Sequence, residues 1–139
     1  MFADTVTVFN YHEDKKQGIA MWYPTVLEGV ELQITKGINV SKSGNSAADA
    51  ANLHIKINAD IQRAYKKPKE YKALEDKQGF FTLKPDDFFV AGEYKAGRID
   101  ENDYPNGFFE YMKSNYDDVY NITTVDVFKA IPHFEVGGK

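Results

Sequence analysis

The residues of this 139-residue chain with the clearest capacity for acid–base or metal chemistry are three histidines, His12, His54 and His133. They show no ligand spacing such as two histidines at helical spacing beside a glutamate. His54 falls on the polar side of an alternating stretch and His12 falls in a charged segment. Because isolated histidines carry no site geometry, we expect solvated side chains and no metal site.

Two acidic doublets, Asp86-Asp87 and Asp117-Asp118, are the next candidates. Paired-carboxylate catalysis needs two groups that converge across a pocket, whereas the side chains of adjacent residues diverge. Aspartate is favoured in turns and caps, so we expect those roles instead. The acidic cluster of Asp100, Glu101 and Asp103 lacks the glycine and the terminal glutamate of a twelve-residue calcium loop.

Motifs for nucleophiles and phosphate binding are also missing from the sequence. No serine lies in a G-x-S-x-G elbow, and no glycine-rich stretch has the G-x-x-x-x-G-K-[ST] order. The absence of cysteine excludes disulfides, thiolate zinc sites and cysteine nucleophiles, and it fits a reducing compartment. We therefore expect no enzymatic activity and no cofactor, which favours a structural or binding protein.

Binding surfaces are suggested by basic and aromatic residues. Lysines and an arginine alternate with tyrosines over residues 63–72, a mixture that can contact a nucleic-acid backbone and stack bases. Acidic residues dilute this run, a solvated helix face gives the same pattern, and the net charge of −4 argues against a general nucleic-acid binder. The candidate partner-facing patch consists of Arg63, Lys66, Lys67 and Tyr71. Trp22-Tyr23 could form a sugar platform or a protein contact, although a strand tryptophan most often lies in the core.

Strands must position most of these residues. Alternating apolar and polar residues predict strands over residues 4–11, 19–26, 30–35, 52–57, 119–128 and 133–136, the first two as a hairpin. Two aromatic-rich runs over residues 79–94 flank Lys84-Pro85-Asp86-Asp87 and predict strand, tight connection, strand. Pro24 confines its strand to an edge or a bulge, and a bulge near Thr123-Thr124 repairs the alternation of the sixth segment.

Two short helices are predicted, over residues 69–76 and 108–116, and two long polar loops over residues 35–51 and 95–107. The resulting class is mainly β: a small β-barrel or sandwich with one or two short inserted helices and long loops, in a single domain over residues 1–139. The N-terminal stretch does not read as a secretory signal, and no apolar run is long enough to cross a bilayer.

Several stretches carry a resemblance when taken in order. They are Trp22-Tyr23-Pro24-Thr25-Val26-Leu27-Glu28-Gly29-Val30, then Asn39-Val40-Ser41-Lys42-Ser43-Gly44 leading through residues 47–51 into Leu53-His54-Ile55, then Gly79-Phe80-Phe81-Thr82-Leu83 with Asp87-Phe88-Phe89-Val90-Ala91-Gly92-Glu93, and finally Pro132-His133-Phe134-Glu135-Val136. This order resembles the head-tail connector family, also labelled stopper or minor capsid proteins, of tailed bacteriophages and prophages of Gram-positive bacteria. The resemblance excludes residues 95–118.

The resemblance implies a barrel protein of the virion neck, assembled in the bacterial host cytoplasm as a homo-oligomeric ring of six or twelve copies. Its implied partners are the portal or adaptor proteins, the tail terminator or tail proteins, and packaged DNA in transient proximity, with no membrane, enzymatic activity or cofactor. A ring subunit can direct a long loop at its neighbours or into the channel. The candidate loop residues are Lys36, Asn39, Lys42, Asn45 and Ser46.

Three alternatives stay open at this point. A tail terminator or tail completion protein would have similar chemistry at a different position in the particle. A small β-barrel enzyme or carbohydrate-binding module would use Trp22-Tyr23, Tyr104 and acidic residues between Asp86 and Asp103. A nucleic-acid binder would use residues 63–72 and would bind in a strongly salt-dependent way.

Overall fold

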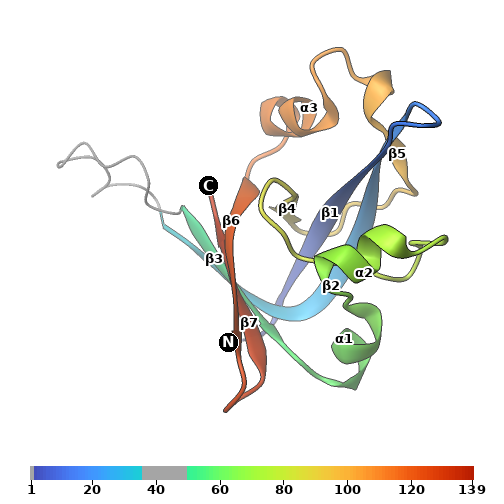
Figure 1. Ribbon diagram of the computed structural model, residues 1–139. Helices are drawn as coiled ribbons and strands as arrows, with labels where there is room; N and C mark the ends of the chain where they lie inside the picture. The colour runs from blue at the N-terminus through green and yellow to red at the C-terminus, as the bar shows by residue number, and fades with distance from the viewer. Residues whose placement is uncertain (1, 36–49) are drawn as a thin grey trace.

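Six antiparallel strands close into a barrel in the computed structural model, which describes residues 2–35 and 50–139 (Figure 1). The strands are β1 (Asp4–Asp14), β2 (Ile19–Ile34), β3 (Ala51–Lys56), β4 (Phe88–Ala91), β6 (Val119–Phe128) and β7 (His133–Gly138). Their order is β1-β4-β6-β7-β3-β2, and β2 pairs back with β1 to close the cylinder. A short strand, β5 (Ile99–Asp100), is added to β2. The expected mainly β class is confirmed, and of the two expected architectures the chain forms the barrel.

The long hairpin of β1 and β2 differs from the prediction in two places. β1 continues through His12 to Asp14, so the turn is narrower than the loop predicted over residues 12–18. β2 is one strand where two were predicted, because Gly29 adopts a φ of +69° and lets the chain pass through an irregularity without ending the strand. The first part of β2 pairs with β1 and its last four residues pair with β3.

The aromatic stretch of residues 79–94 holds one strand, β4, and the strand predicted over its first run is wrong. Phe81 makes only an isolated bridge to Tyr65, with its N–H donating to the Ala64 carbonyl (3.0 Å). Because the backbone of this run pairs with the segment between two helices, it does not join the barrel wall. Its buried side chains, Phe81 and Leu83, fill the barrel interior instead.

Over residues 2–35 and 50–139, four helical segments accompany the barrel: α1 (Ala59–Ala64), α2 (Pro68–Ala73), η1 (Glu101–Asp103) and α3 (Phe108–Asn115). The predicted helices at 69–76 and 108–116 correspond to α2 and α3. α1 was not predicted, although its N-cap is readable, because the Asn58 side chain accepts a hydrogen bond from the Ile61 N–H (2.9 Å). Within the described residues, no helix combines the length and the apolar composition needed to span a membrane.

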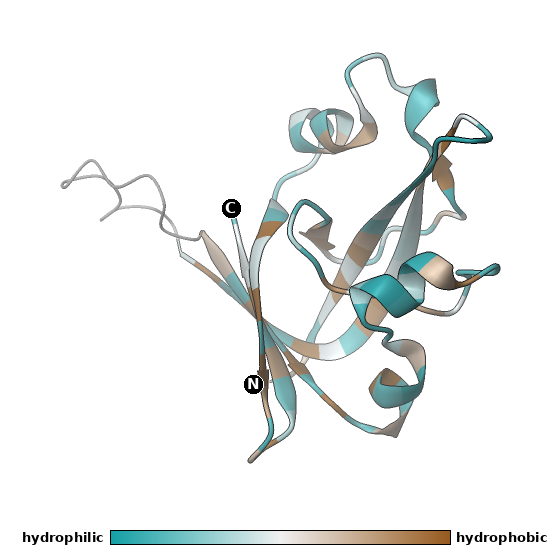
Figure 2. Cartoon of the chain, in the orientation of Figure 1, coloured by the Kyte–Doolittle hydropathy of each residue, from teal (hydrophilic) through white to brown (hydrophobic). Residues whose placement is uncertain are grey.

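Two hydrophobic clusters lie on opposite faces of β4, so strand alternation decides where each aromatic ring packs. Phe89 belongs to the cluster inside the barrel, with residues such as Leu53 and Phe134. Phe88 and Val90 belong to a second cluster that residues 99–112 cover from outside, and Phe108 is at its centre. Figure 2 shows the matching alternation of hydrophobic and hydrophilic positions along the strands. The segment over residues 95–118 therefore covers the outer face of β1 and β4.

The bulge predicted at Thr123-Thr124 is confirmed. The register of β6 against β7 shifts between Ile122 and Thr124. This shift explains why Tyr120 and Ile122 are out of phase with Val125 in the sequence, although all three pack on the same interior cluster.

Candidate functional site

The predicted loop residues Lys36, Asn39, Lys42, Asn45 and Ser46 lie outside the residues that the structure describes. Thr35 and Ala50, the described residues on either side of this segment, locate its two ends. The Thr35 N–H donates to the Ala50 carbonyl (2.7 Å), so the chain leaves the barrel after β2 and returns before β3 at the same place.

The hairpin of β6 and β7 exposes apolar side chains at the opposite end of β3. Lys56, the last residue of β3, pairs with His133, the first residue of β7, whereas Ala51 pairs with Gly138. At the hairpin end Val127, Phe128 and Ile131 are 53%, 44% and 77% exposed. Figure 1 shows this hairpin reaching beyond the other strands at the end away from α3. This surface was not predicted from the sequence, although apolar residues beside the Ile131-Pro132 bend were a signal for it.

The predicted partner-facing patch is only partly at the surface. Arg63, Lys66 and Lys67 lie on the outside, where Arg63 pairs with Asp60 and Lys66 holds its Nζ 5.2 Å from the centre of the Phe80 ring. Tyr71 is 2% exposed and belongs to the core, so its assignment to this patch was wrong. One face of α2 must pack on the barrel, and the tyrosine is the apolar residue available on that face. Burial raises the pKa of Tyr71.

Further lysines line a hollow between α2 and β1. Its volume is about 390 Å³, and its lining is mostly basic and aromatic, comprising Tyr11, His12, Glu13, Lys15, Pro68, Lys69, Tyr71, Lys72 and Lys84. Burial and the nearby Lys77 ammonium lower the pKa of His12. The side chain was predicted to be solvated, but it is partly buried. The lining of the hollow thus includes four lysine side chains and one carboxylate, Glu13.

Of the acidic doublets, one residue of each adopts the predicted turn geometry. Asp86 and Asp118 adopt positive φ angles of 76° and 57°, which is turn geometry that aspartate tolerates. Asp87 instead lies fully buried and accepts hydrogen bonds from Asn10, the Tyr11 N–H and Lys84. Burial raises the pKa of Asp87, against the lowering effect of these three donors. The two carboxylates of the doublet thus point to different environments.

Trp22 contributes no exposed ring to the aromatic surface proposed at Trp22-Tyr23. Trp22 is buried in the second cluster, and its Nε1–H donates to the Glu101 carboxylate (2.9 Å), which also accepts from the Phe108 N–H (2.8 Å). A sugar platform on this tryptophan is therefore wrong. Tyr104 lines a separate open hollow of about 520 Å³ that has one carboxylate, Glu110, in its lining.

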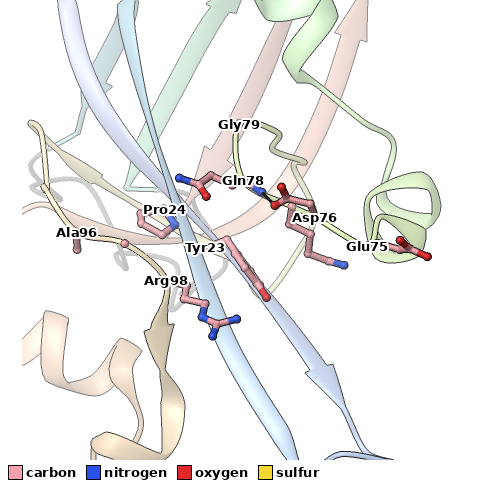
Figure 3. A pocket seen from close by; sticks show the side chains of 10 residues that line it. Tyr23, Pro24, Glu75, Asp76, Gln78, Gly79, Ala96 and Arg98 are labelled. Atoms are coloured by element: carbon pink, nitrogen blue, oxygen red, sulfur yellow. Dashed lines mark hydrogen bonds between the residues drawn. The ribbon is translucent and has the colours of Figure 1, made fainter.

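A pocket of about 350 Å³ lies beside Pro24, which pairs with Phe9 of β1. It is at the other edge of β2, between the residues that pair with β5 and those that pair with β3. Figure 3 shows Tyr23 between Arg98 on one side and Asp76 on the other. Its two carboxylates, Glu75 and Asp76, are neighbours on one wall. They do not face each other across the pocket, which is the arrangement that paired-carboxylate chemistry requires.

Two of the three histidines come together, which sequence analysis did not predict. His54 on β3 stacks on His133 of β7 with ring centres 5.9 Å apart, and Glu135 lies beside them. The available signal was the spacing of His133 and Glu135, since alternate residues of a strand share a face. Their juxtaposition with His54 depends on the pairing of β3 with β7, two segments 77 positions apart, which no local pattern reveals.

Comparison with known proteins gives one description. A model of the "Family of unknown function (DUF6751)" matches residues 1–139. No curated protein and no solved structure matches the chain.

Proposed function

The chain belongs to the family of unknown function DUF6751, and from its fold and surfaces we propose that it is a structural component of a bacteriophage neck. In this role it forms a homo-oligomeric ring that joins the portal or adaptor of the capsid to the tail. The proposal starts from the ordered sequence resemblance to head-tail connectors, which the closed barrel fits.

The observation that carries the proposal is the exposed apolar end of the β6–β7 hairpin. Phe128 and Ile131 stay uncovered while the barrel interior is filled by other residues. Exposed aromatic and aliphatic residues on a protruding element are typical of contact surfaces between subunits. We assign this end to the contact with the neighbouring copy in the ring.

At the opposite end of the barrel, the Thr35 N–H donates to the Ala50 carbonyl. We assign a second contact to the candidate loop between these two residues, which lies outside the described residues. A ring subunit with a contact at each end can reach both a neighbour and the channel or an adjacent ring. A stopper role, closing the channel until infection, is the finer form of this proposal.

A tail terminator or tail completion protein remains the second candidate. It shares the ring and the apolar contact and differs in position. The order of genes separates the two, since a stopper gene lies between the capsid genes and the tail-tube gene.

Mass measurement of the purified chain tests the ring contact. At high protein concentration we expect closed assemblies, such as six copies of the 15.8 kDa chain at about 95 kDa. Replacing Phe128 and Ile131 together by serine is expected to shift the population to monomers, because the apolar contact is lost. Replacing the exposed, polar Lys129 by serine is the matched control and should leave assembly unchanged. Assemblies that persist unchanged in the double variant would rule out the hairpin contact.

A further inference from the structure

The cluster of His54, His133 and Glu135 has the composition of a metal site. Each residue offers one ligand atom, and the three atoms lie within 4.8 Å of one another. The arrangement follows from the strand register, because His54 pairs directly with Glu135 and His133 is two residues away on the same face of β7. The cluster is on the outer side of the barrel, since the alternating residues Leu53, Ile55 and others face the interior.

The orientation of His133 is the second observation. Its Nδ1 lies 2.6 Å from the Ile131 carbonyl oxygen, and its Nε2 lies 2.9 Å from Glu135 Oε2. A carbonyl oxygen can only accept, so Nδ1 carries the proton. In the neutral ring, Nε2 then presents a lone pair to a carboxylate oxygen, and two acceptors at this distance require a cation or a further proton between them. Ligating histidines commonly donate their second N–H to a backbone carbonyl in this way.

The imidazole ring of His133 is held in place by stacking. The His133 ring stacks on two other rings. Its centre is 4.9 Å from that of Phe128, with an interplanar angle of 9°, and 5.9 Å from that of His54, with an angle of 23°. A ring fixed by stacking and by a backbone hydrogen bond loses little freedom when it binds an ion. The site is thus partly organised before any ligand arrives.

The surrounding charges favour a cation. One row of directly paired residues crosses four strands on this face and consists of Glu31, His54, Glu135 and Asp126. Its three carboxylates are spread on both sides of the imidazole of His54. The cation two residues along β3, Lys56, directs its Nζ to the ring of Phe2, 4.4 Å from the ring centre.

We propose that His54, His133 and Glu135 bind one divalent transition-metal ion, with zinc the best match to two imidazoles and one carboxylate. Zinc binds such ligands at about 2.0–2.2 Å, and a tetrahedral ion keeps its ligands roughly 3.3 Å apart. His133 and Glu135 separate slightly to admit the ion, and the His54 ring turns toward it. The partly exposed side chains of His133 and Glu135 leave a fourth position open to water.

The ion would join β3 to β7 at the base of the apolar hairpin. Ligands from two strands stabilise the folded chain, because the site does not exist when the strands separate. This inference does not depend on the proposed ring, and it departs from the sequence-based expectation of no metal site.

The test is calorimetric titration of the untagged, EDTA-treated chain with zinc chloride. We expect one zinc ion per chain and a rise in melting temperature of roughly 5–10 °C at a hundredfold excess over Kd. His133→Gln and Glu135→Gln should each weaken binding at least tenfold. His12→Gln is the matched control, a histidine outside the cluster, and should bind zinc as the natural chain does.

Titration with cobalt chloride adds a spectroscopic measurement, since a tetrahedral site with two imidazoles gives intense visible absorption that an unstructured surface site does not. Glu135→Gln preserves size and lies on the outer face, so circular dichroism should show it folded. The proposal is overturned if the titration with zinc chloride shows no saturable binding. It is equally overturned if the folded cluster variants bind as tightly as the His12→Gln control.

Discussion

Replacing Asp87 by asparagine should destabilise the fold although the two side chains have the same shape. Asp87 Oδ2 accepts from Asn10 Nδ2 (2.9 Å), and Oδ1 accepts from the Tyr11 N–H (3.1 Å) and from Lys84 Nζ (2.8 Å). Both carboxylate oxygens therefore face donors. An asparagine must place its own NH₂ group against one of these donors in either orientation.

Asn10 cannot rotate its amide to relieve this conflict. Its Oδ1 accepts from the Thr82 N–H (3.1 Å), and its Nδ2 also donates to the Thr82 carbonyl (2.8 Å). The backbone of Thr82 thus fixes which end of Asn10 faces Asp87. The variant leaves two donors unpaired, at a cost of about 1–3 kcal/mol each. Part of this cost is offset because the variant no longer buries a charge. We therefore expect the free energy of unfolding to fall by about 2–4 kcal/mol.

Urea unfolding followed by circular dichroism measures this loss. For a chain of this length the melting temperature should fall by roughly 10 °C. Asp86→Gly is the matched control: Asp86 is the exposed neighbour with a φ of +76°, which glycine adopts without strain, so stability should stay within about 1 kcal/mol of the natural chain. An Asp87→Asn protein as stable as the Asp86→Gly protein would refute the hydrogen-bond network.

Two further predictions concern the barrel wall. A Cβ on Gly138 would lie 2.9 Å from Tyr120 Cβ and 3.0 Å from the Phe89 ring, so Gly138→Ala should lower the free energy of unfolding in urea by about 1–3 kcal/mol. Gly97→Ala is the control and should be nearly neutral, because its Cβ meets no atom within 4 Å. Equal stabilities of the two variants would contradict the packing. Burial and the hydrogen bond to Asp118 raise the pKa of Tyr120 to about 12, so the native chain retains a proton that the unfolded chain loses above pH 10. Between pH 9 and pH 11 the natural chain should lose about 1 kcal/mol more stability than Tyr120→Phe, and identical losses would show that Tyr120 ionises equally in both states.

Local patterns predicted the strands well because side-chain alternation records which face is buried. The same pattern located the bulge at Thr123-Thr124, where the alternation breaks. The pattern gave the wrong prediction at Phe80-Phe81, because an aromatic run can form a strand or can be a non-strand segment whose side chains fill the barrel interior. The backbone partner, the α1–α2 connection, decided between the two.

Surface features that depend on strand pairing could not be predicted from single segments. Tyr71 was placed on the surface because its neighbours are charged, yet one face of a short helix must pack on the core. His54 and Glu135 became neighbours only when β3 paired with β7. The burial of Asp87 was not predicted, because its neighbour Asp86 is also an aspartate and does lie in a turn.

Electron microscopy of tailed particles that carry a labelled copy of this chain tests the neck assignment most directly. The account predicts a closed ring of the chain between the portal end of the capsid and the tail, with the β6–β7 hairpin of each copy against its neighbour. Purified, infectious particles that contain no copy of the chain would contradict it.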